Sequence, residues 1–212
     1  KERVNVFLDG EFAFGLALIE AAMLHKGQQL SDAEISALKA GDEVQQAYDR
    51  AIRFLGQRPR STAEVRRSLS QRQIDAGVID EVIARLEGQG YLDDAAFARY
   101  WIGNRQQFRP RGERALRFEL REKGVPDSII GETLSGFDTS EAAYQAAQDR
   151  ARRLRGLEKR EFREKLGAFM ARRGFDFETV REVTDRLWAE IHQDAGQGSG
   201  FVPPTTDDIE ES

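Results

Sequence analysis

Apolar residues recur at helical spacing along most of this chain, and one segment with that spacing occurs twice. An Arg-Pro-Arg run precedes Val65 and Leu69, and fifty-one residues later the same run precedes Leu116 and Leu120. Apolar residues at positions i and i+4 lie on one face of a helix. Each copy is therefore predicted to be a short helix with its apolar face against a core, and the repetition predicts a repeat architecture.

A third copy keeps the apolar positions but not the basic ones. Fifty residues after the second copy, Leu166 and Met170 occupy the positions of Leu116 and Leu120. Positions that are apolar in all three copies indicate scaffold, whereas arginines present in only two copies indicate a surface with a function. The second-copy arginines and their third-copy counterparts are, in order, Arg111, Arg114 and Arg117 against Glu161, Glu164 and Gly167.

The apolar pattern divides most of the chain into three predicted three-helix repeats. Glycines mark several helix ends, and Asp93 is expected to cap the first helix of the second repeat. The other predicted helices are 43–55, 61–71 and 75–89, then 112–123 and 126–134, then 140–154, 158–173 and 177–192. The predicted domains are an extension (1–42), three repeats (43–92, 93–138 and 139–193) and a disordered acidic tail (194–212).

The first residues of the chain are predicted to form a small β-hairpin followed by a helix. Residues 3–14 alternate between apolar and other side chains around Asp9-Gly10, a dipeptide typical of tight hairpin turns. An Ala- and Leu-rich helix is expected to follow as far as about His25, with Gly27 ending it.

A capping box predicts a further helix before the first repeat. Ser31 and Glu34 have the spacing in which each side chain caps the other's backbone amide, and the helix is expected to run through Lys39. The junction Gly41-Asp42 is the predicted boundary between the extension and the repeats.

The net charge of −5 hides an uneven distribution. Residues 50–175 hold 26 Lys and Arg against 18 Asp and Glu, a net charge of +8, and the remainder of the chain is acidic. All but three of those 26 cations are arginine, whose planar guanidinium pairs with phosphate and carboxylate and stacks on bases. The basic middle favours an anionic partner, although solvated helix faces and a GC-rich genome produce the same bias.

Composition removes several classes of protein. The 212 residues include no cysteine, so disulfides and thiol chemistry are excluded, which suits the cytoplasm. The longest apolar stretch, Phe12 to Leu24, contains Glu20 and is too short to span a bilayer. A cytoplasmic protein without membrane contact is therefore expected. The sequence begins at Lys1 without a signal peptide and is compatible with a fragment.

No catalytic, metal or cofactor site is predicted. His25 and His192 lie in different modules without metal-ligand neighbours at useful spacing, and both are expected near helix ends. Asp93 and Asp94 are interpreted as a helix cap rather than as paired catalytic acids. A Walker loop, a nucleophile elbow and a dinucleotide fingerprint are absent from the sequence. We therefore expect that the protein is not an enzyme.

The basic faces of the first two repeats are the strongest candidate for a binding site. Such faces follow a nucleic-acid backbone or an acidic protein surface, and without a recognisable base-reading set no sequence specificity is expected. Tyr91 and Trp101 are of a type that stacks on bases, but Trp101 is expected in the core. The candidate residues for partner or DNA binding are Arg58, Arg60, Arg66, Arg67, Arg105, Arg109, Arg111, Arg114, Arg117 and Arg121.

Several of these segments, taken in order, resemble the RecX family, the regulators of the bacterial RecA recombinase. The resemblance covers about residues 47–187, and the ordered set is specific although no single segment is. The extension and the tail inherit no function from it. The segments are Arg58-Pro-Arg-Ser61 leading to Leu69, Gly90-Tyr-Leu-Asp-Asp94 with Phe97, Trp101 and Arg105, Arg111-Gly112 leading to Lys123-Gly124-Val125, and Phe162 leading to Arg172-Arg-Gly-Phe175.

The resemblance implies a mainly α fold of tandem three-helix, helix-turn-helix-like repeats in a curved rod. It also implies binding along the groove of the RecA–DNA filament, inhibition of its ATPase and strand-exchange activity, and a part in recombination, DNA repair and the SOS response. Weak, nonspecific binding to single- or double-stranded DNA and a monomeric state are expected. Two alternatives remain open: a sequence-nonspecific DNA-binding helical module that acts independently of RecA, and a helical adaptor without a role on DNA.

Overall fold

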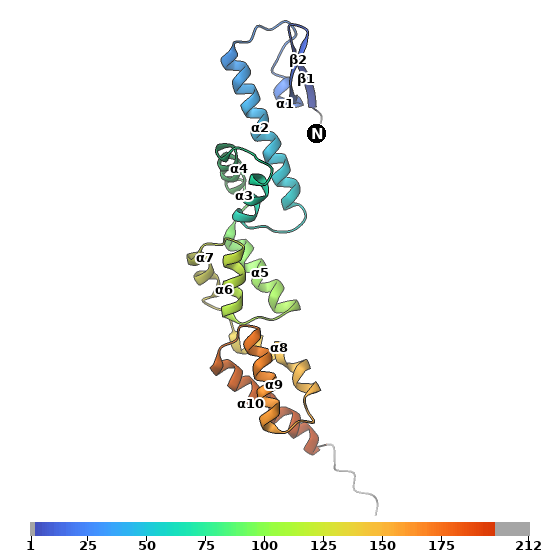
Figure 1. Ribbon diagram of the computed structural model, residues 1–212, viewed down its shortest axis with the longest axis vertical. Helices are drawn as coiled ribbons and strands as arrows, with labels where there is room; N and C mark the ends of the chain where they lie inside the picture. The colour runs from blue at the N-terminus through green and yellow to red at the C-terminus, as the bar shows by residue number, and fades with distance from the viewer. Residues whose placement is uncertain (1–2, 198–212) are drawn as a thin grey trace, which may run out of the picture. The chain divides into compact units, whose positions relative to one another are not determined.

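The computed structural model describes residues 3–197, and helices make up most of that part of the chain (Figure 1). Contacts divide the chain into two compact units, residues up to Tyr100 together with Leu120–Ile130, and Trp101–Glu119 together with the residues from Gly131 onward. The predicted mainly α fold is confirmed. The prediction of a disordered tail is wrong for residues 194–197, which belong to the last helix, and residues 198–212 of that tail lie outside the described residues. The helices of the three triplets are α2 (Asp32–Leu55), α3 (Thr62–Ser70) and α4 (Ala76–Gly88), then α5 (Asp94–Phe108), α6 (Glu113–Glu122) and α7 (Asp127–Leu134), then α8 (Thr139–Arg153), α9 (Lys159–Arg172) and α10 (Phe177–Gln197).

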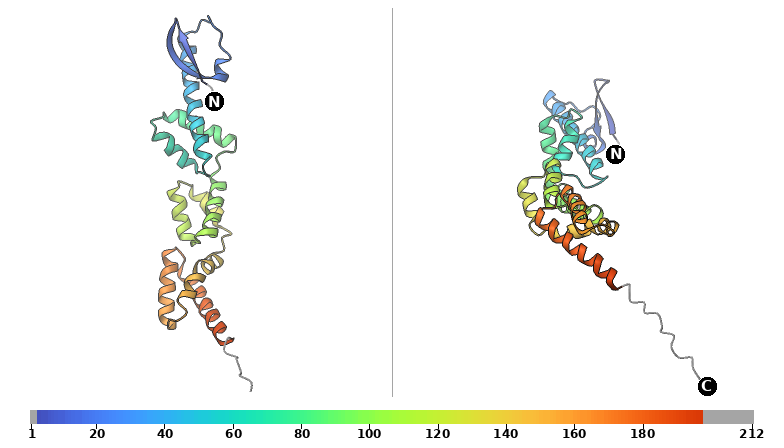
Figure 2. Two further views of the ribbon diagram at one scale, coloured as in Figure 1. Left: turned by 90° about the vertical axis from the view of Figure 1, so that its right-hand side faces the viewer. Right: turned by 60° about the horizontal axis from the view of Figure 1, so that its bottom comes forward.

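The predicted hairpin is present at the amino-terminal end of the described chain (Figures 1 and 2). Strands β1 (Arg3–Leu8) and β2 (Glu11–Ala17) pair antiparallel and are joined by Asp9 and Gly10, whose φ angles are 51° and 86°. Glycine adopts positive φ without steric cost and Asp tolerates it, so the Asp-Gly dipeptide makes the turn that the strands need.

The helix after the hairpin is much shorter than predicted. Strand β2 continues through Ala17 and α1 spans only Leu18–Ala21, so the prediction of a helix as far as His25 is wrong. Leu16 is completely buried, and burying it requires the extended backbone of the strand. This packing outweighs the helix propensity of the neighbouring Ala and Leu residues.

Helix α2 is continuous where a break was predicted. The capping box of Ser31 and Glu34 is present, but the helix runs through Gly41 instead of ending at Lys39. A helical glycine costs roughly 1 kcal/mol, and tertiary contacts offset it here. Arg3 of the hairpin donates to both carboxylate oxygens of the buried Asp42, at 2.8 and 2.7 Å. Pairing of strand and helix at this point holds the helix through the glycine.

Both units have a core in which small residues on one helix face larger ones on two others. In the first unit, Ala47 and Ala51 of α2 are buried against α3 and α4, to which Leu69 and Leu86 belong. The alanines let the helix backbones approach closely while the larger side chains fill the space between them.

The second unit repeats that arrangement. Ala147 and Ala151 of α8 are buried together with Leu166 and Met170 of α9 and with Leu187 of α10. The apolar pairs that define the three sequence copies are all buried, so their prediction as core is confirmed.

The entrance of α3 is joined to the turn between α6 and α7, within the first unit. The Ser61 hydroxyl donates to the Lys123 carbonyl at 2.5 Å, and the Lys123 ammonium lies 3.1 Å from Glu64. The Glu64 carboxylate also pairs with Arg58 at 2.7 Å. Gly124 has φ of +77°, and a Cβ there would lie 2.3 Å from the Ala63 Cβ.

The entrance of α6 meets the turn between α9 and α10 in the same way, within the second unit. The Gly112 amide donates to the Arg173 carbonyl at 3.0 Å. A Cβ on Gly112 would lie 2.3 Å from the Gly174 carbonyl oxygen, and Gly174 itself has φ of +86°. Ser61 and Gly112 are matched by the fifty-one-residue shift, so the two joints are equivalent parts of the repeat.

The second joint predicts the effect of a methyl group at Gly112. We expect Gly112→Ala to lower the free energy of unfolding by about 3 kcal/mol, because overpacking against backbone atoms costs roughly 1–3 kcal/mol and backbone cannot move aside easily. Urea denaturation followed by circular dichroism measures the change. Gly103→Ala is the matched control, since a Cβ there meets nothing within 4 Å, and it should be neutral or slightly stabilising.

The first joint predicts a pH dependence of stability. Burial alone would raise the pKa of Glu64, but hydrogen bonds from Arg58, Lys123 and the Ser61 amide outweigh burial and lower that pKa from 4.5 to about 2. A carboxyl group with a lowered folded-state pKa stabilises the fold above its unfolded pKa, and that stabilisation is lost as the pH falls toward the folded pKa. The loss is at most about 3 kcal/mol, because each pKa unit corresponds to 1.36 kcal/mol.

Chemical denaturation of the wild type and of Glu64→Gln checks this dependence. We expect the wild type to be more stable at neutral pH, and the difference to shrink below about pH 4.5 as the Glu64 carboxylate takes up a proton. The exposed Glu87→Gln is the control and should leave the pH profile unchanged. A constant difference between wild type and Glu64→Gln down to pH 2.5 would contradict the assignment.

Candidate interface for an anionic partner

The predicted basic face of the first repeat is largely bound up in its own structure. Arg58 pairs with Glu64, and Arg66 pairs with Asp80 of α4. The Arg60 guanidinium lies 3.9 Å from the centre of the Phe54 ring, and burial, then the neighbouring Arg58, lowers its pKa. Of the four arginines predicted here, Arg67 alone is exposed without an ion pair to any residue in the described range.

The basic face of the second repeat converges on one carboxylate. Glu119 of α6 lies 2.7 Å from Arg105 and 3.6 Å from Arg111, and it accepts a hydrogen bond from the Trp101 indole at 2.8 Å. Trp101 is therefore half-buried, with its indole N–H satisfied, rather than a fully buried core residue. Four charged and polar groups thus hold one another in place on this face.

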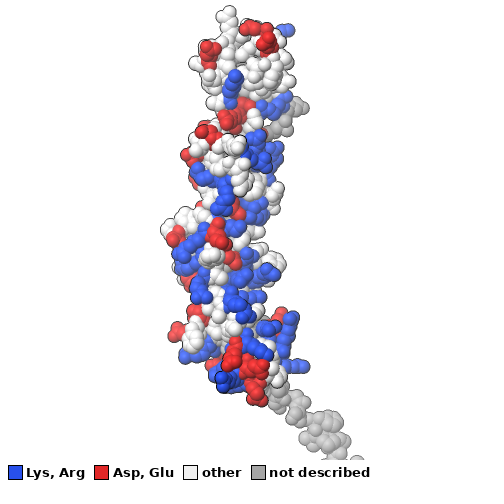
Figure 3. Space-filling model, viewed as in Figure 1, with Lys and Arg blue, Asp and Glu red and all other residues white. Residues whose placement is uncertain are grey.

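The remaining predicted residues of the second repeat divide into paired and unpaired arginines. Arg117 pairs with Glu113 at 2.7 Å, and Arg121 with Asp127 at 2.6 Å. Arg109 and Arg114 are exposed, and neither forms an ion pair with a carboxylate whose side chain the structure describes. Figure 3 shows acidic side chains interspersed among the basic ones on the displayed face, in keeping with this partial neutralisation.

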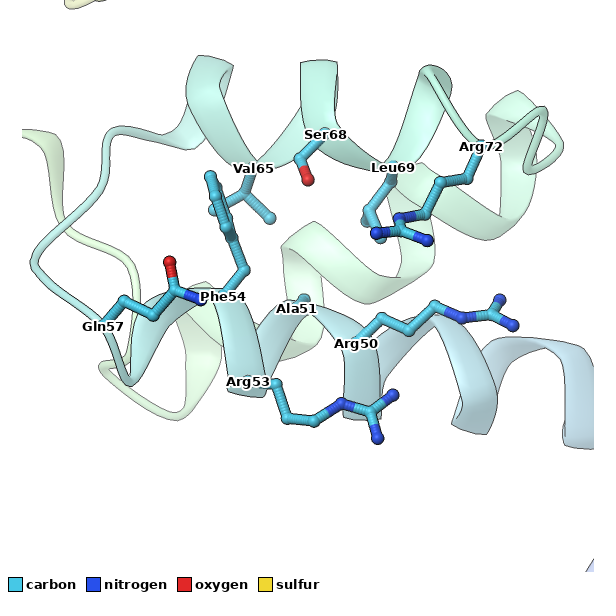
Figure 4. A pocket seen from close by; sticks show the side chains of 9 residues that line it. All are labelled: Arg50, Ala51, Arg53, Phe54, Gln57, Val65, Ser68, Leu69 and Arg72. Carbon is cyan, nitrogen blue, oxygen red and sulfur yellow. The ribbon is translucent and has the colours of Figure 1, made fainter.

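A hollow between α2 and α3 gathers arginines that the sequence analysis did not select. It has a volume of about 320 Å³ and is lined by Arg50 and Arg53 of α2 and by Arg72 in the turn after α3. Figure 4 shows the guanidinium groups of Arg50 and Arg72 at one end of the hollow, with the Phe54 ring toward the other end. The buried Ala51 and Leu69 form its apolar base.

A second hollow, within the second unit, has the same kind of lining. Its volume is about 460 Å³, and Arg150 and Arg153 of α8 line it together with Arg173 in the turn after α9. Arg173 lies 4.4 Å from the centre of the Phe169 ring and donates to the Pro110 carbonyl at 3.4 Å. Burial, followed by the nearby charges of Arg111 and Arg109, lowers the pKa of Arg173, so this region carries a positive field.

The sequence contains a signal for these hollows at an offset of one hundred residues, longer than the fifty-one-residue offset that relates the first two repeats. Asp49-Arg50-Ala51-Ile52-Arg53 is matched one hundred residues later by Asp149-Arg150-Ala151-Arg152-Arg153. The second helices, on which the repeat described above rests, do not carry this signal, because the third copy has no arginines at the matching positions. The signal lies on the first helices, where both copies keep two arginines three residues apart.

The acidic and imidazole candidates for catalysis have structural roles. Asp93 accepts hydrogen bonds from the Ala95 and Ala96 amides at 2.8 and 3.0 Å, so it is the predicted helix cap. Asp94 accepts from the Thr62 amide at 2.8 Å, and its burial raises its pKa.

The remaining chemistry-bearing residues do not form a site either. The His192 ring is stacked on Trp188, with 3.7 Å between centroids, whereas His25 lies beyond the end of α1. In the part of the chain that the structure describes, His, Asp and Glu residues form no group that could hold a metal ion. No helix within residues 3–197 is long and apolar enough to cross a membrane.

Comparisons with known proteins agree with the three-helix organisation. Models of the first, second and third three-helix domains of RecX match residues 47–86, 93–134 and 138–184. A crystal structure of regulatory protein RecX superimposes with a TM-score of 0.73 at 26% identity, covering 86% of this chain and 94% of that one. The RecX structure from Lactobacillus salivarius gives a TM-score of 0.64 at 21% identity, covering 69% and 97%.

Curated relatives extend the similarity beyond the repeats. The regulatory protein RecX of Chlorobium phaeobacteroides (strain BS1) is 38% identical over 149 residues, 70% of this chain and 98% of the relative. That of Bacillus subtilis (strain 168) is 33% identical over 198 residues, 91% of this chain and 75% of the relative, so its match includes part of the hairpin extension. With three consecutive domain matches and relatives of this identity, the chain belongs to the RecX family of regulatory proteins.

Proposed function

We propose that this chain binds the filament that the RecA recombinase forms on DNA and lowers its ATPase and strand-exchange activity. The observation that carries the proposal is the presence of three consecutive RecX domains in one chain, with relatives that are named regulatory proteins. RecX-family regulators act on RecA. In this proposal the protein works as a cytoplasmic monomer without catalytic activity of its own, and it tunes recombination, DNA repair and the SOS response.

The proposed contact surface is the part of the basic face that the chain's own carboxylates leave unneutralised. Arg67, Arg109 and Arg114 are exposed and form no ion pair with a residue described by the structure. A guanidinium without a carboxylate partner is available to acidic residues of a protein or to phosphates of DNA. Ion-paired members of the set, such as Arg58 in the first repeat and Arg105 in the second, would hold the helices of their own repeats in place.

The proposed mechanism is mechanical rather than chemical. Repeated three-helix domains give the chain several separate places at which to contact neighbouring recombinase subunits. Contacts to two subunits at once oppose the subunit motions that accompany ATP hydrolysis, and a protein lying on the filament obstructs the entry of a second duplex.

A sequence-nonspecific DNA-binding module that acts without RecA is the second candidate. The net charge of +8 over residues 50–175 and the exposed arginines favour it. This candidate requires tight binding to bare DNA with a steep dependence on salt concentration, because each phosphate contact releases counterions. The filament regulator requires only weak binding to bare DNA.

An ATPase titration tests the filament proposal. We expect the single-stranded-DNA-dependent ATPase of the cognate RecA to fall at amounts of this protein well below the amount of RecA, because one bound chain affects several subunits. The rate of phosphate release is the measurement. An unchanged rate of phosphate release, together with salt-dependent binding to bare DNA, would contradict filament regulation and favour the DNA-binding module that acts without RecA.

The double substitution Arg109→Glu with Arg114→Glu tests the contact surface. We expect the concentration needed for half-inhibition to rise at least about tenfold, because each lost charge-assisted contact is worth roughly 1.5–3 kcal/mol and 1.4 kcal/mol corresponds to a factor of ten. Arg155→Glu with Arg181→Glu is the matched control, since it changes the charge equally at exposed positions off the predicted face. Equal loss of inhibition in both double variants would rule out a specific role for this face.

A further inference from the structure

The two arginine-lined hollows occupy equivalent positions in the first and third repeats. In each, two arginines three residues apart on the first helix line the hollow together with a third arginine in the turn after the second helix. Ala51 and Ala151, which are both buried, follow the first arginine of each pair. Within each repeat, the arginines therefore hold the same position relative to the buried alanine of their own helix. The corresponding trios are Arg50, Arg53 and Arg72 in the first repeat and Arg150, Arg153 and Arg173 in the third.

The middle repeat lacks this arrangement. The fifty-one-residue shift matches Arg50, Arg53 and Arg72 with Trp101, Asn104 and Lys123. Only Lys123 of these is cationic, and it lies 3.1 Å from Glu64 in the first joint. The hollows are therefore a feature of two repeats separated by a third, and not a by-product of the fold.

The charge of the first hollow is not balanced by the chain itself. No acidic residue lines it, and Arg50, Arg53 and Arg72 form no ion pair with residues of the described chain. Three cations around one hollow repel one another, so the hollow favours an anion that accepts hydrogen bonds from several of them. Ser68 and Gln57 add a hydroxyl and an amide to the lining.

The second hollow has a similar excess of positive charge. Its one acidic lining residue, Asp149, lies 3.2 Å from Arg152, which is outside the lining. Arg150 and Arg153 have no ion-pair partner among the side chains that the structure describes. The positive field around Arg173, noted above, adds to the attraction for an anion.

The hollows suit the backbone of a nucleic acid better than its bases. The Phe54 ring in the first hollow is covered by the Arg60 guanidinium at 3.9 Å, and the Phe169 ring in the second by Arg173 at 4.4 Å. One face of each ring is thus covered by a guanidinium, which leaves less ring surface for a base to stack on. Phe108, which is 67% exposed, borders only the second hollow, so a stacking contribution is confined to that one.

We propose that each arginine-lined hollow binds one phosphate group of a nucleic-acid backbone, so that the first and third repeats each supply one phosphate site and the middle repeat supplies none. A phosphodiester carries a negative charge and oxygens that accept hydrogen bonds, which suits a hollow lined by several guanidinium groups. This inference deepens the proposed function and rests on it only in taking DNA as the ligand. It differs from the contact surface proposed above, since the hollow arginines lie on other elements than Arg109 and Arg114.

Salt-dependent binding to a fluorescently labelled single-stranded oligonucleotide tests the proposal in the full chain. The variants are Arg50→Gln with Arg53→Gln, Arg150→Gln with Arg153→Gln, and all four together. Each contact to a phosphate of a single strand contributes about 0.7 to the slope of log K against log salt concentration. We expect each double variant to reduce the slope by about 0.7 and the quadruple variant by about 1.4, with unchanged circular dichroism.

The matched control removes two charges from exposed positions outside the hollows. Arg155→Gln with Arg181→Gln should leave the slope close to that of the wild type. Equal losses in control and hollow variants would overturn the proposal in favour of diffuse attraction, as would unchanged slopes in the hollow variants. Competition with inorganic phosphate distinguishes a site for a free anion: full displacement of the oligonucleotide at millimolar phosphate and constant ionic strength would overturn the assignment to a nucleic-acid backbone.

The ATPase measurement separates this inference from the proposed function. Reduced salt slopes in the hollow variants, with a wild type that does not inhibit RecA, would support the hollows and refute filament regulation. Loss of inhibition in the quadruple variant with an unchanged salt slope would instead assign the hollows to the recombinase, and it would overturn DNA as their ligand.

Discussion

The close approach of one helix entrance to the turn of the next repeat is the constraint on which this structure depends. At one joint a hydroxyl donates to the carbonyl before Gly124, and at the other the amide of Gly112 donates to the carbonyl before Gly174. A Cβ at any of these glycines would lie within 2.5 Å of a neighbouring atom. Each repeat thus packs against its neighbour. The stability of such chains is approximately the sum of the contributions of the repeats and of the interfaces between adjacent repeats.

Acidic residues decide which arginines remain available to a partner. Glu64 and Glu119 each pair with two cationic side chains. These four cationic side chains stabilise the helix entrances. The arginines of the hollows and a few exposed ones on α3 and α6 escape such pairing within the described chain. Counting basic residues therefore overstates the positive charge that the described chain leaves for a partner, because carboxylates neutralise part of it.

Helical periodicity predicted the fold well where packing and local preference agree. The helices from α3 to α9 begin and end close to the expected residues because capping side chains and glycines mark them, whereas α10 ends at Gln197, inside the predicted tail. The errors came from long-range contacts: burial of Leu16 extended β2, and the pairing of Arg3 with Asp42 carried α2 through Gly41. The arginine candidates could be chosen from sequence, but their pairing could not, because Glu119 meets Arg105 from a different helix.

The unbroken course of α2 also has a geometric consequence. The hairpin is fastened to this helix at Asp42, and the first repeat is packed on it at Ala47 and Ala51. A helix turns by about 100° per residue, so the number of residues between these anchors fixes the azimuth of the hairpin around the first repeat. One inserted residue would rotate the hairpin by about 100° around the helix axis. An insertion of about seven residues, close to two turns, would nearly restore its original orientation. The spacer can therefore change length only in steps of whole turns if the hairpin is to keep facing the same way.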